Sequence, residues 1–278
     1  MTNISGTTRL IGFFGETYRT SKMYSMYNAA FAALELDYVY IPFIVNDLEK
    51  AVQGIRHLGV KAIGVTIPYK IAIVPYLDAL DDDARRIGAV NAVINTNGKL
   101  LGVNTDGRGA LKALQEVTGI SGKKVVVLGA GGAARATAFA VADAKAHLVI
   151  ANRTENAAAG LAKAVGSAYV TLDKLEQALK GADIVINATS VGMAPREDAM
   201  LVSKELLAPE VVVMDFVSTP RETKLLREAR EKGCKIVQGD RMLFWQGVLK
   251  FQAYTGIEPP VEVMEKALED SFNAKTSQ

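Results

Sequence analysis

The segment "KKVVVLGAGGAARATAFAVADA" (123–144) constrains the fold of this chain more than any other stretch. A valine-rich run passes directly into a glycine loop and then into an alanine-rich stretch that favours a helix. In a strand–loop–helix unit of this kind, Gly129 allows a tight turn, Gly131 lets a pyrophosphate approach the backbone, and Ala134 lets helix and strand pack closely. Glycines also mark ordinary turns, so the dinucleotide site is predicted from the flanking strand and helix as well as from the glycines.

Strand-like and helix-like segments alternate along nearly the whole chain, which is typical of α/β architecture with parallel sheets. After Gly122, five buried strands are predicted, enough for a complete doubly wound, Rossmann-type domain. They lie in the segments "KKVVVL", "HLVIAN", "ADIVINATS", "EVVVMDFVS" and "CKIVQGD".

The first part of the chain follows the same alternation with one exception. Strands are predicted in "RLIGFF", "DYVYIPF" and "VKAIGVTI", with helices in "MYNAAFAALEL" and "LEKAVQGIRHL" between them. The exception is "NAVINTNGKLLGVNT" (91–105), where two apolar runs flank Asn97-Gly98, a strong hairpin signal. A hairpin fits a parallel sheet poorly, so we expect it at a sheet edge near a domain boundary.

The tail beyond Arg241 is predicted to be helical and to return to the first domain, making that domain discontinuous. We therefore expect two domains: residues 1–105 with about 247–278, an α/β substrate-binding domain, and residues 106–246, the dinucleotide-binding domain. A deep cleft is expected between them.

Composition limits the partners. The 278 residues carry a formal net charge of +2, which argues against nucleic acid or an anionic membrane as the main partner. A single cysteine, Cys234, and two distant histidines predict no internal disulfide and no metal site. With no basic leader and no apolar run long enough to span a bilayer, we expect a cytoplasmic protein, either a monomer or a homodimer.

The end of the second strand after Gly122 indicates which dinucleotide is bound. An NAD site usually places Asp or Glu there to hold the ribose hydroxyls. This chain has Asn152, Arg153 and Thr154, and the arginine can stack on adenine and pair with a 2′-phosphate. NADP is therefore the predicted cofactor, with NAD as an alternative. The competing interpretation of Arg153 is an ordinary exposed arginine.

Two charged residues stand at the ends of predicted strands. Lys70 follows the apolar run that ends in Thr66, and Asp106 begins a helix just after the hairpin. Each has an ordinary interpretation, a lysine extending to solvent and a helix cap. Both also lie at strand ends, where ligands enter α/β sheets. By contrast, the Tyr-x-x-x-Lys spacing of Tyr18 and Lys22 lies far upstream of the glycine loop and is treated as coincidence.

Seven ordered blocks make the chain resemble the shikimate dehydrogenase family over nearly its whole length: "VTIPYK", "IGAVNAV", "GVNTDGRG", "GAGGAARA", "NRT", "NATSVGM" and "GDRMLFWQGVLKFQAYTG". The resemblance implies an N-terminal substrate domain, a C-terminal NADP domain, and the interconversion of 3-dehydroshikimate and shikimate in aromatic amino acid biosynthesis. It implies a catalytic pair, Lys70 and Asp106, and substrate ligands Ser21, Thr66, Asn91 and Gln246. The implied cofactor contacts are Gly129, Ala130, Gly131, Gly132, Ala133, Asn152, Arg153, Thr154 and Gly239.

The chain departs from the family pattern mainly on the substrate side. The second serine of the family's Ser-x-Ser-Pro is Met23, the usual asparagine before Val-Thr is Gly64, and the usual tyrosine near "DFVSTP" is Ser218. Losing one hydrogen bond to a charged group costs about 1.5–3 kcal/mol, roughly ten- to a hundredfold in binding, unless Thr20 or Tyr24 substitutes. On the cofactor side, a second basic residue is replaced around Asn156 and Ala157, which predicts soft NADP selectivity.

The predicted reaction moves a hydride between a ring carbon and the nicotinamide while the hydroxyl gains or loses a proton. Lys70 holds that oxygen and shuttles the proton, and Asp106 orients lysine and substrate. The substrate is expected to be a small carboxylated polyol: shikimate, quinate, or an amino or deoxy relative. The alternative is a non-catalytic nucleotide-binding sensor on the same scaffold, which has no need to keep Lys70 and Asp106.

Overall fold

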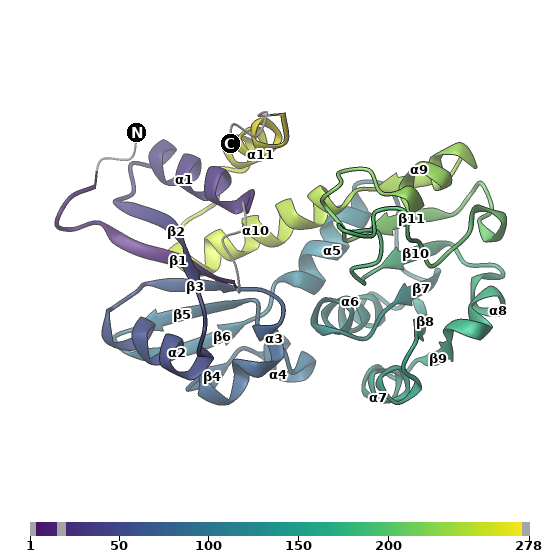
Figure 1. The fold of residues 1–278 in the computed structure, drawn as a ribbon, viewed down its shortest axis with the longest axis horizontal. Helices are drawn as coiled ribbons and strands as arrows, with labels where there is room; N and C mark the ends of the chain where they lie inside the picture. Colours follow the sequence, from purple (N-terminus) through teal and green to yellow (C-terminus); the bar gives the residue numbers. More distant parts are fainter. Residues whose placement is uncertain (1–3, 16–20, 274–278) are drawn as a thin grey trace. The chain divides into compact units, whose positions relative to one another are not determined.

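The computed structural model describes residues 4–15 and 21–273, and the chain divides into two compact units. The first unit contains residues 1–105 and 247–278, and the second contains residues 106–246. Each has its own six-stranded sheet covered by helices (Figure 1). The fold class predicted from the sequence, a two-domain α/β protein with a Rossmann-type second domain, is confirmed.

The sheet of the first unit has the strand order β2-β1-β3-β5-β6-β4. β1, β2 and β3 are parallel, whereas β5 and β6 form an antiparallel hairpin whose turn, Asn97-Gly98, has positive φ at both residues. The sequence predicted this hairpin at the edge of the sheet. It is not at the edge, because the two-residue strand β4 pairs outside β6. The helices and strands of the first unit are β1 (Arg9–Gly15), α1 (Met23–Ala33), β2 (Tyr38–Ile44), α2 (Leu48–His57), β3 (Ala62–Val65), α3 (Tyr69–Ala72), β4 (Ala79–Leu80), α4 (Asp82–Ile87), β5 (Ala92–Thr96), β6 (Lys99–Val103) and α11 (Val261–Asn273), together with the second half of α10 (Gly239–Thr255).

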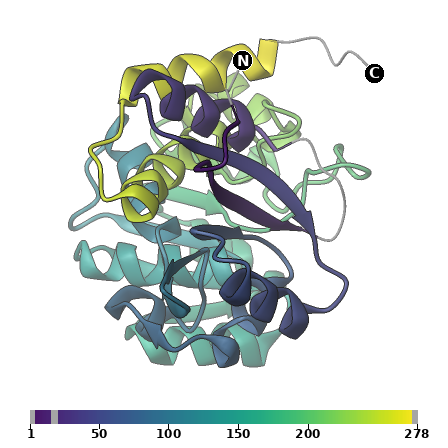
Figure 2. The same ribbon diagram turned by 90° about the vertical axis from the view of Figure 1, so that its left-hand side faces the viewer.

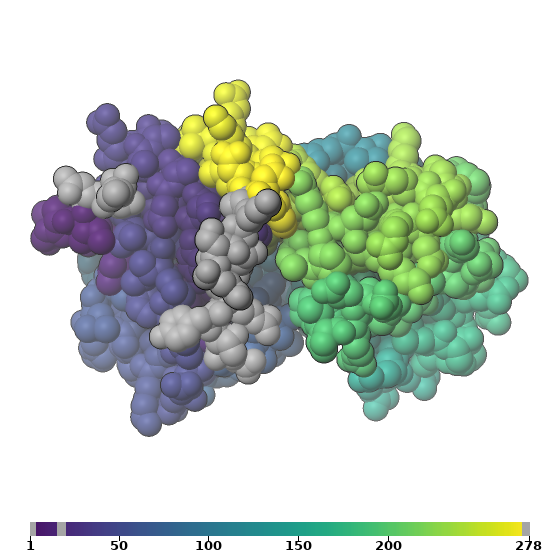
Figure 3. Space-filling model, turned by 45° about the horizontal axis from the view of Figure 1, so that its top comes forward, coloured from purple at the N-terminus to yellow at the C-terminus, as the bar shows by residue number. Residues whose placement is uncertain are grey.

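Helices cover both faces of this first sheet. Side chains alternate along β3, so Ile63 and Val65 face the core beneath α2, while Gly64 faces the tyrosines of the opposite layer. That opposite layer contains α1, α11 and the second half of α10 (Gly239–Thr255). Figure 2 shows α11 (yellow) running beside α1 (purple), and in Figure 3 the same C-terminal helix lies against the N-terminal part of the chain. The C-terminal segment therefore completes the first unit.

The sheet of the second unit is entirely parallel, with the order β12-β11-β10-β7-β8-β9. This is the doubly wound order, in which the order of strand addition reverses between two neighbouring strands, β7 (the first) and β10 (the fourth). Its elements are α5 (Asp106–Gln115), β7 (Lys124–Leu128), α6 (Gly132–Asp143), β8 (His147–Asn152), α7 (Glu155–Val165), β9 (Ala168–Thr171), α8 (Leu175–Leu179), β10 (Ile184–Asn187), β11 (Val212–Asp215), α9 (Lys224–Glu231), β12 (Lys235–Val237) and the first half of α10.

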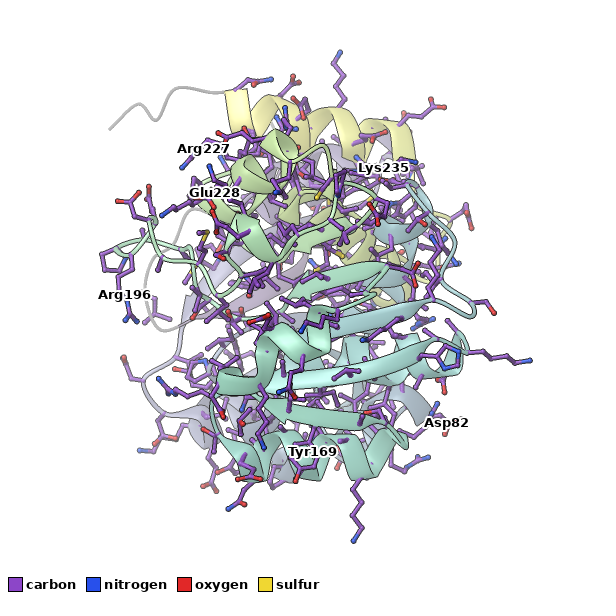
Figure 4. All side chains as sticks on the ribbon, turned by 90° about the vertical axis from the view of Figure 1, so that its right-hand side faces the viewer. Asp82, Tyr169, Arg196, Arg227, Glu228 and Lys235 are labelled. Atoms are coloured by element: carbon purple, nitrogen blue, oxygen red, sulfur yellow. The ribbon has the colours of Figure 1, made fainter. Side chains whose placement is uncertain are left out.

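The second sheet has one strand more than the five predicted from the sequence. The additional strand, β9, has four residues and forms the edge of the sheet, where Tyr169 is exposed (Figure 4). α8 and α9 pack on one face of the sheet around Leu175 and Leu226. α5, α6 and α7 pack side by side on the other face. None of the described helices is long and apolar enough to cross a membrane.

Candidate active site

The glycine loop of the second unit has the geometry that the sequence predicts. Gly129 directly follows the buried strand β7 and has φ = 113°, in the left-handed region that favours glycine. A side chain there would place its Cβ 3.0 Å from Cγ2 of Thr189 and 3.2 Å from the carbonyl oxygen of Ala188. Gly129 is therefore required both for the turn and for close packing against the loop after β10.

Gly131 and α6 leave the backbone open at the next turn. Gly131 is the N-cap of α6, and no other atom lies within 4 Å of the Cβ that a side chain would add. Helix α6 then begins at Gly132 with its first N–H groups free of intrahelical partners, which is the arrangement that holds a phosphate. Ala134 is completely buried where α6 packs closely on the sheet. The residues present fit a pyrophosphate at Gly129–Ala133.

An exposed guanidinium follows the end of β8. Asn152 is the last residue of β8, and its side-chain amide donates to the carbonyl of Thr154 at 3.0 Å, which closes the turn into α7. Arg153 and Thr154 are exposed, and Arg153 makes no ion pair or hydrogen bond with any described residue. An unpaired cation at this strand end fits a 2′-phosphate. Asn156 and Ala157, which replace the second basic residue of the family pattern, are exposed in the first turn of α7.

A buried polar network, which the sequence did not predict, lies at the ends of β10 and β11. Asn187 ends β10 and Asp215 ends β11, opposite one another in the strand register. The Asp215 carboxylate accepts from the amide of Asn187 at 2.9 Å and from the hydroxyl of Thr223 at 2.7 Å. Burial raises the pKa of Asp215 to about 6, although these hydrogen bonds act in the opposite direction. The available signal was a polar residue ending each of two neighbouring apolar runs.

Gly239 and Gln246 lie on the part of α10 that belongs to the second unit. Gly239 begins α10, and a side chain there would overlap the carbonyl of Val217. Gln246 is buried, and its backbone nitrogen would lie 2.7 Å from a Cβ added at Gly109 of α5. Between them in the sequence, Arg241 forms an ion pair with Glu116, which directly follows α5. Burial raises the pKa of Glu116, but hydrogen bonds from Arg241 and Trp245 lower it, and the net effect is a lowered pKa.

In the first unit, Thr66, Lys70 and Asn91 lie together at the carboxyl end of β3. Thr66 follows β3 directly, and its carbonyl accepts from the backbone of Tyr69 in the short helix α3. Lys70, half-buried in α3, accepts through its carbonyl from the N–H of Val90, next to Asn91. The strand predicted to reach Ile67 thus ends at Val65, and the lysine is carried on a helical turn.

Asn91 connects this group to Thr105, the last residue of this part of the first unit. Its side chain is buried; the amide donates to the hydroxyl of Thr105 at 2.9 Å, and its oxygen accepts from the Thr105 N–H at 3.0 Å. Asp106 follows Thr105 directly, is 2% exposed, and begins α5. The N-terminus of a helix favours a carboxylate. Lys70 belongs to the first unit and Asp106 to the second, so their approach to each other stays a prediction.

The carboxylate side of the predicted substrate site is only partly described. Ser21 is half-buried before α1, and its hydroxyl accepts from the backbone of Met23 at 3.3 Å. Met23, which replaces a family serine, is 1% exposed and packs against Gly247 in α10. It therefore supplies core packing in the first unit. Tyr18 and Thr20 lie outside the described residues.

Tyrosine hydroxyls fill the space above Gly64, where the family has asparagine. A Cβ at Gly64 would lie 2.8 Å from the hydroxyl of Tyr40 and 3.2 Å from that of Tyr254. Both hydroxyls are buried without a hydrogen-bond partner among the described residues, and burial raises the pKa of both tyrosines well above the ordinary value. Ser218, at the third departure from the family pattern, is half-buried and follows Val217, which contacts Gly239.

The doubly wound sheet, the glycine loop and the unpaired arginine define a dinucleotide-binding α/β protein of the oxidoreductase type. Among the described residues no group of three or more His, Cys, Asp or Glu could hold a metal ion. Three family models match the chain: the shikimate dehydrogenase substrate binding domain over residues 13–93, shikimate/quinate 5-dehydrogenase over 111–229, and the shikimate 5′-dehydrogenase C-terminal domain over 241–269.

Individual relatives match over almost their full length. A shikimate dehydrogenase (NADP⁺) of Pyrococcus abyssi is 43% identical over 258 residues, covering 93% of this chain and 96% of the relative. The crystal structure of a shikimate dehydrogenase in complex with NADP⁺ superimposes with a TM-score of 0.93 at 41% identity, covering 99% of both chains. A Thermus thermophilus shikimate 5-dehydrogenase in complex with NADP(H) and shikimate gives a TM-score of 0.86 at 35% identity, covering 95% of this chain and 99% of that one. The chain belongs to the shikimate dehydrogenase family.

Proposed function

We propose that this chain is an NADP-dependent dehydrogenase that interconverts the 3-keto and 3-hydroxyl forms of a shikimate-type ring. The observation that carries the proposal is the grouping of Thr66, Lys70 and Asn91 at one strand end of the first unit, in a chain whose second unit has a complete glycine loop. A lysine at such a strand end is suited to hold a substrate oxygen. Relatives that match over their full length and are named as NADP⁺-dependent enzymes favour this function over a non-catalytic sensor.

The predicted contacts divide between the cofactor and the substrate. Gly129, Ala130, Gly131, Gly132 and Ala133 hold the pyrophosphate, Asn152, Arg153 and Thr154 hold the adenosine 2′-phosphate, and Gly239 lines the site at the start of α10. Bound NADPH supplies the hydride. Ser21, Thr66, Asn91 and Gln246 bind the polar groups of the substrate. Residues 106–246 thus serve as the cofactor domain and the remainder as the substrate domain.

Lys70 and Asp106 carry the proton chemistry in this proposal. The reacting oxygen gains a proton when the ketone is reduced and loses it when the alcohol is oxidised. The Lys70 ammonium holds that oxygen and donates a proton to it during reduction, and the neutral Lys70 amine takes the proton from the hydroxyl during oxidation. Asp106 orients the ammonium and the substrate hydroxyl. A positioned group of this kind typically contributes about 10²–10⁴-fold to the rate.

The substrate we propose is shikimate, with quinate and amino or deoxy relatives as the alternatives that Met23, Gly64 and Ser218 leave open. A small carboxylated polyol matches the polar side chains at the strand ends of the first unit. We further propose a cytoplasmic protein, monomeric or homodimeric, that does not bind nucleic acid.

Steady-state assays test the proposal. The kcat/KM of each polyol is measured with NADP and with NAD, following NADPH or NADH absorbance. We expect turnover of at least one polyol, with NADP preferred. Absence of turnover with every polyol, together with tight NADP binding, would favour the sensor instead. If shikimate with NADP exceeds every relative by orders of magnitude, the altered substrate side has not changed specificity.

A further inference from the structure

The loop after β10 lies where a doubly wound sheet binds its ligand. β10 is the neighbour of β7 across the point at which the strand order reverses, and Asn187 is opposite Leu128 in the register. Ligands of such sheets bind outside the carboxyl ends of these two strands. The glycine loop follows β7, and the segment that contains Ala188 and Thr189 follows β10 and packs against Gly129. The two segments therefore line the same site from opposite sides.

The Asn187 side chain holds the loop after β10 in its turn. Its oxygen accepts from the backbone N–H of Thr189 at 3.2 Å and from the Thr189 hydroxyl at 2.7 Å. Its amide donates to the carbonyl of Val191 at 3.1 Å, and the N–H of Val191 returns to the Thr189 hydroxyl at 3.1 Å. The three bonds made by Asn187 need its amide in one orientation, with its oxygen toward Thr189.

Asp215 selects that orientation from the adjacent strand. It is completely buried, and its Oδ1 accepts from the Asn187 amide nitrogen at 2.9 Å and from the N–H of Val217 at 3.0 Å. Its Oδ2 accepts from Thr223, which is also the N-cap of α9. A carboxylate has no proton to donate, so only the amide nitrogen of Asn187 can face it. The Val217 segment fixed by the same carboxylate packs on Gly239.

We propose that Asp215 is a positioning residue for the nicotinamide half of the cofactor site, acting through Asn187 and Val217. The inference rests on the proposed function, in which the 2′-phosphate lies at the end of β8 and the pyrophosphate at the end of β7. The remaining half of a dinucleotide then extends across the switch point, toward the loops that follow β10 and β11. Those are the two loops that Asp215 holds in place.

The test separates the two halves of the cofactor. We compare Asp215→Ala with the wild type for binding of NADP and of 2′,5′-ADP, which contains only the adenosine half, by calorimetry, and measure KM for NADP and kcat. Because Asp215→Ala removes a buried charged hydrogen-bond acceptor, we expect the dissociation constant for NADP to rise by about tenfold or more and kcat to fall. Affinity for 2′,5′-ADP is expected to stay within about twofold, since its contacts lie on β7 and β8.

Matched variants distinguish positioning from general damage to the fold. Asp215→Asn retains an acceptor for Asn187 and Val217 and can donate to Thr223, so it should restore NADP binding to within about threefold of wild type. Asn187→Ala should reproduce the Asp215→Ala pattern, and it serves in its place if that variant does not fold. Asp183→Ala is the control, since this exposed aspartate accepts from the backbone of Lys124 at the opposite end of the sheet.

Three results would overturn the inference: equal losses of NADP and 2′,5′-ADP affinity in Asp215→Ala or Asn187→Ala, no loss of either, or a loss in Asp183→Ala of the same size. Failure of Asp215→Asn to restore binding would also contradict it. A wild-type protein that bound neither NADP nor 2′,5′-ADP would instead refute the proposed function, so the two failures are distinguishable.

Discussion

The strand ends of the two units present different kinds of candidate site. In the second unit the predicted pyrophosphate contacts are backbone groups of a glycine loop at a helix N-terminus, within five consecutive residues. In the first unit the predicted substrate and catalytic contacts are the side chains of Ser21, Thr66, Lys70 and Asn91, which come from separate segments. The backbone site depends mainly on local conformation, whereas the side-chain site depends on what packs around each group.

The difference explains where the chain departs from its family. Gly129 tolerates no side chain, because of both its φ and its contact with Thr189, so the cofactor loop has little freedom to vary. At Gly64 a different set of neighbours, Tyr40 and Tyr254, occupies the space of a side chain. Side-chain sites can thus change their contacts through compensating neighbours, and substrate preference can change while cofactor binding persists.

Removing the Lys70 ammonium should give the largest difference between an effect on turnover and an effect on cofactor binding. Lys70→Ala is expected to lower kcat by about 10²–10⁴-fold, the usual contribution of a positioned proton donor. The dissociation constant for NADP should not change, because the predicted cofactor contacts lie in the second unit. Lys61→Ala, at the opposite end of β3, is the matched control. Unchanged turnover in Lys70→Ala would remove the lysine from the mechanism.

A buried carboxylate in the second unit predicts a pH dependence of stability. Burial raises the pKa of Asp215 from 3.8 to about 6, so the fold favours the protonated carboxyl. Its contribution to the free energy of unfolding is fully present below pH 4 and is lost as the pH rises through 6. The loss approaches about 3 kcal/mol at neutral pH.

Asp215→Asn removes this titration and supplies the measurement. Trp245, the single tryptophan, lies in the second unit, so its fluorescence reports urea unfolding of that unit. The unfolding free energy of wild type relative to Asp215→Asn should fall between pH 4 and 7 by that amount. A difference that stays constant with pH would show that the carboxyl keeps an ordinary pKa.

Arg153 tests whether the cofactor side is selective for the 2′-phosphate. Arg153→Ala removes the guanidinium that is predicted to bind the 2′-phosphate. It should raise KM for NADP about ten- to a hundredfold and leave KM for NAD nearly unchanged. Arg227→Ala is the control, since that arginine is exposed on α9 (Figure 4). Equal effects on both cofactors would assign Arg153 to the surface.

Restoring the family asparagine at Gly64 tests the compensation on the substrate side. Gly64→Asn should destabilise the first unit by about 1–3 kcal/mol, because the new side chain overlaps Tyr40, Phe13 and Tyr254. Combining it with Tyr40→Phe should reduce that loss, and a thermal-unfolding double-mutant cycle measures the coupling. Gly54→Asn, with no atom within 4 Å of its Cβ, is the control. Additive effects would mean that Tyr40 does not fill the position.

The sequence predicted the long apolar strands and the glycine loop because both follow from local patterns. It missed β4 and β9 because they have only two and four residues and lie at sheet edges, where an apolar run is not needed. It extended β3 to Ile67, since the apolar pattern continues, whereas the chain turns at Pro68 into α3. The hairpin turn was correct, but its position in the sheet depended on the missed strand β4.

The candidate site divides in the same way. Gly129 and Ala134 could be placed because their roles depend on adjacent residues. Asp215 could not, because its partners Asn187 and Thr223 are brought to it by strand pairing and by the start of α9. Met23 likewise resembles a lost ligand in the sequence, and only the packing against Gly247 shows that it belongs to the core.

Helix α10 runs without interruption from Gly239 to Thr255, and the boundary between the units falls inside it, after Gln246. The units are consequently not portable modules. A fragment ending at residue 246 would cut the helix halfway, exposing unsatisfied carbonyls and removing the segment that completes the helical layer of the first unit's sheet. Exchange of domains between homologues should therefore keep all of α10 from one parent, with the crossover placed in the turn that precedes it.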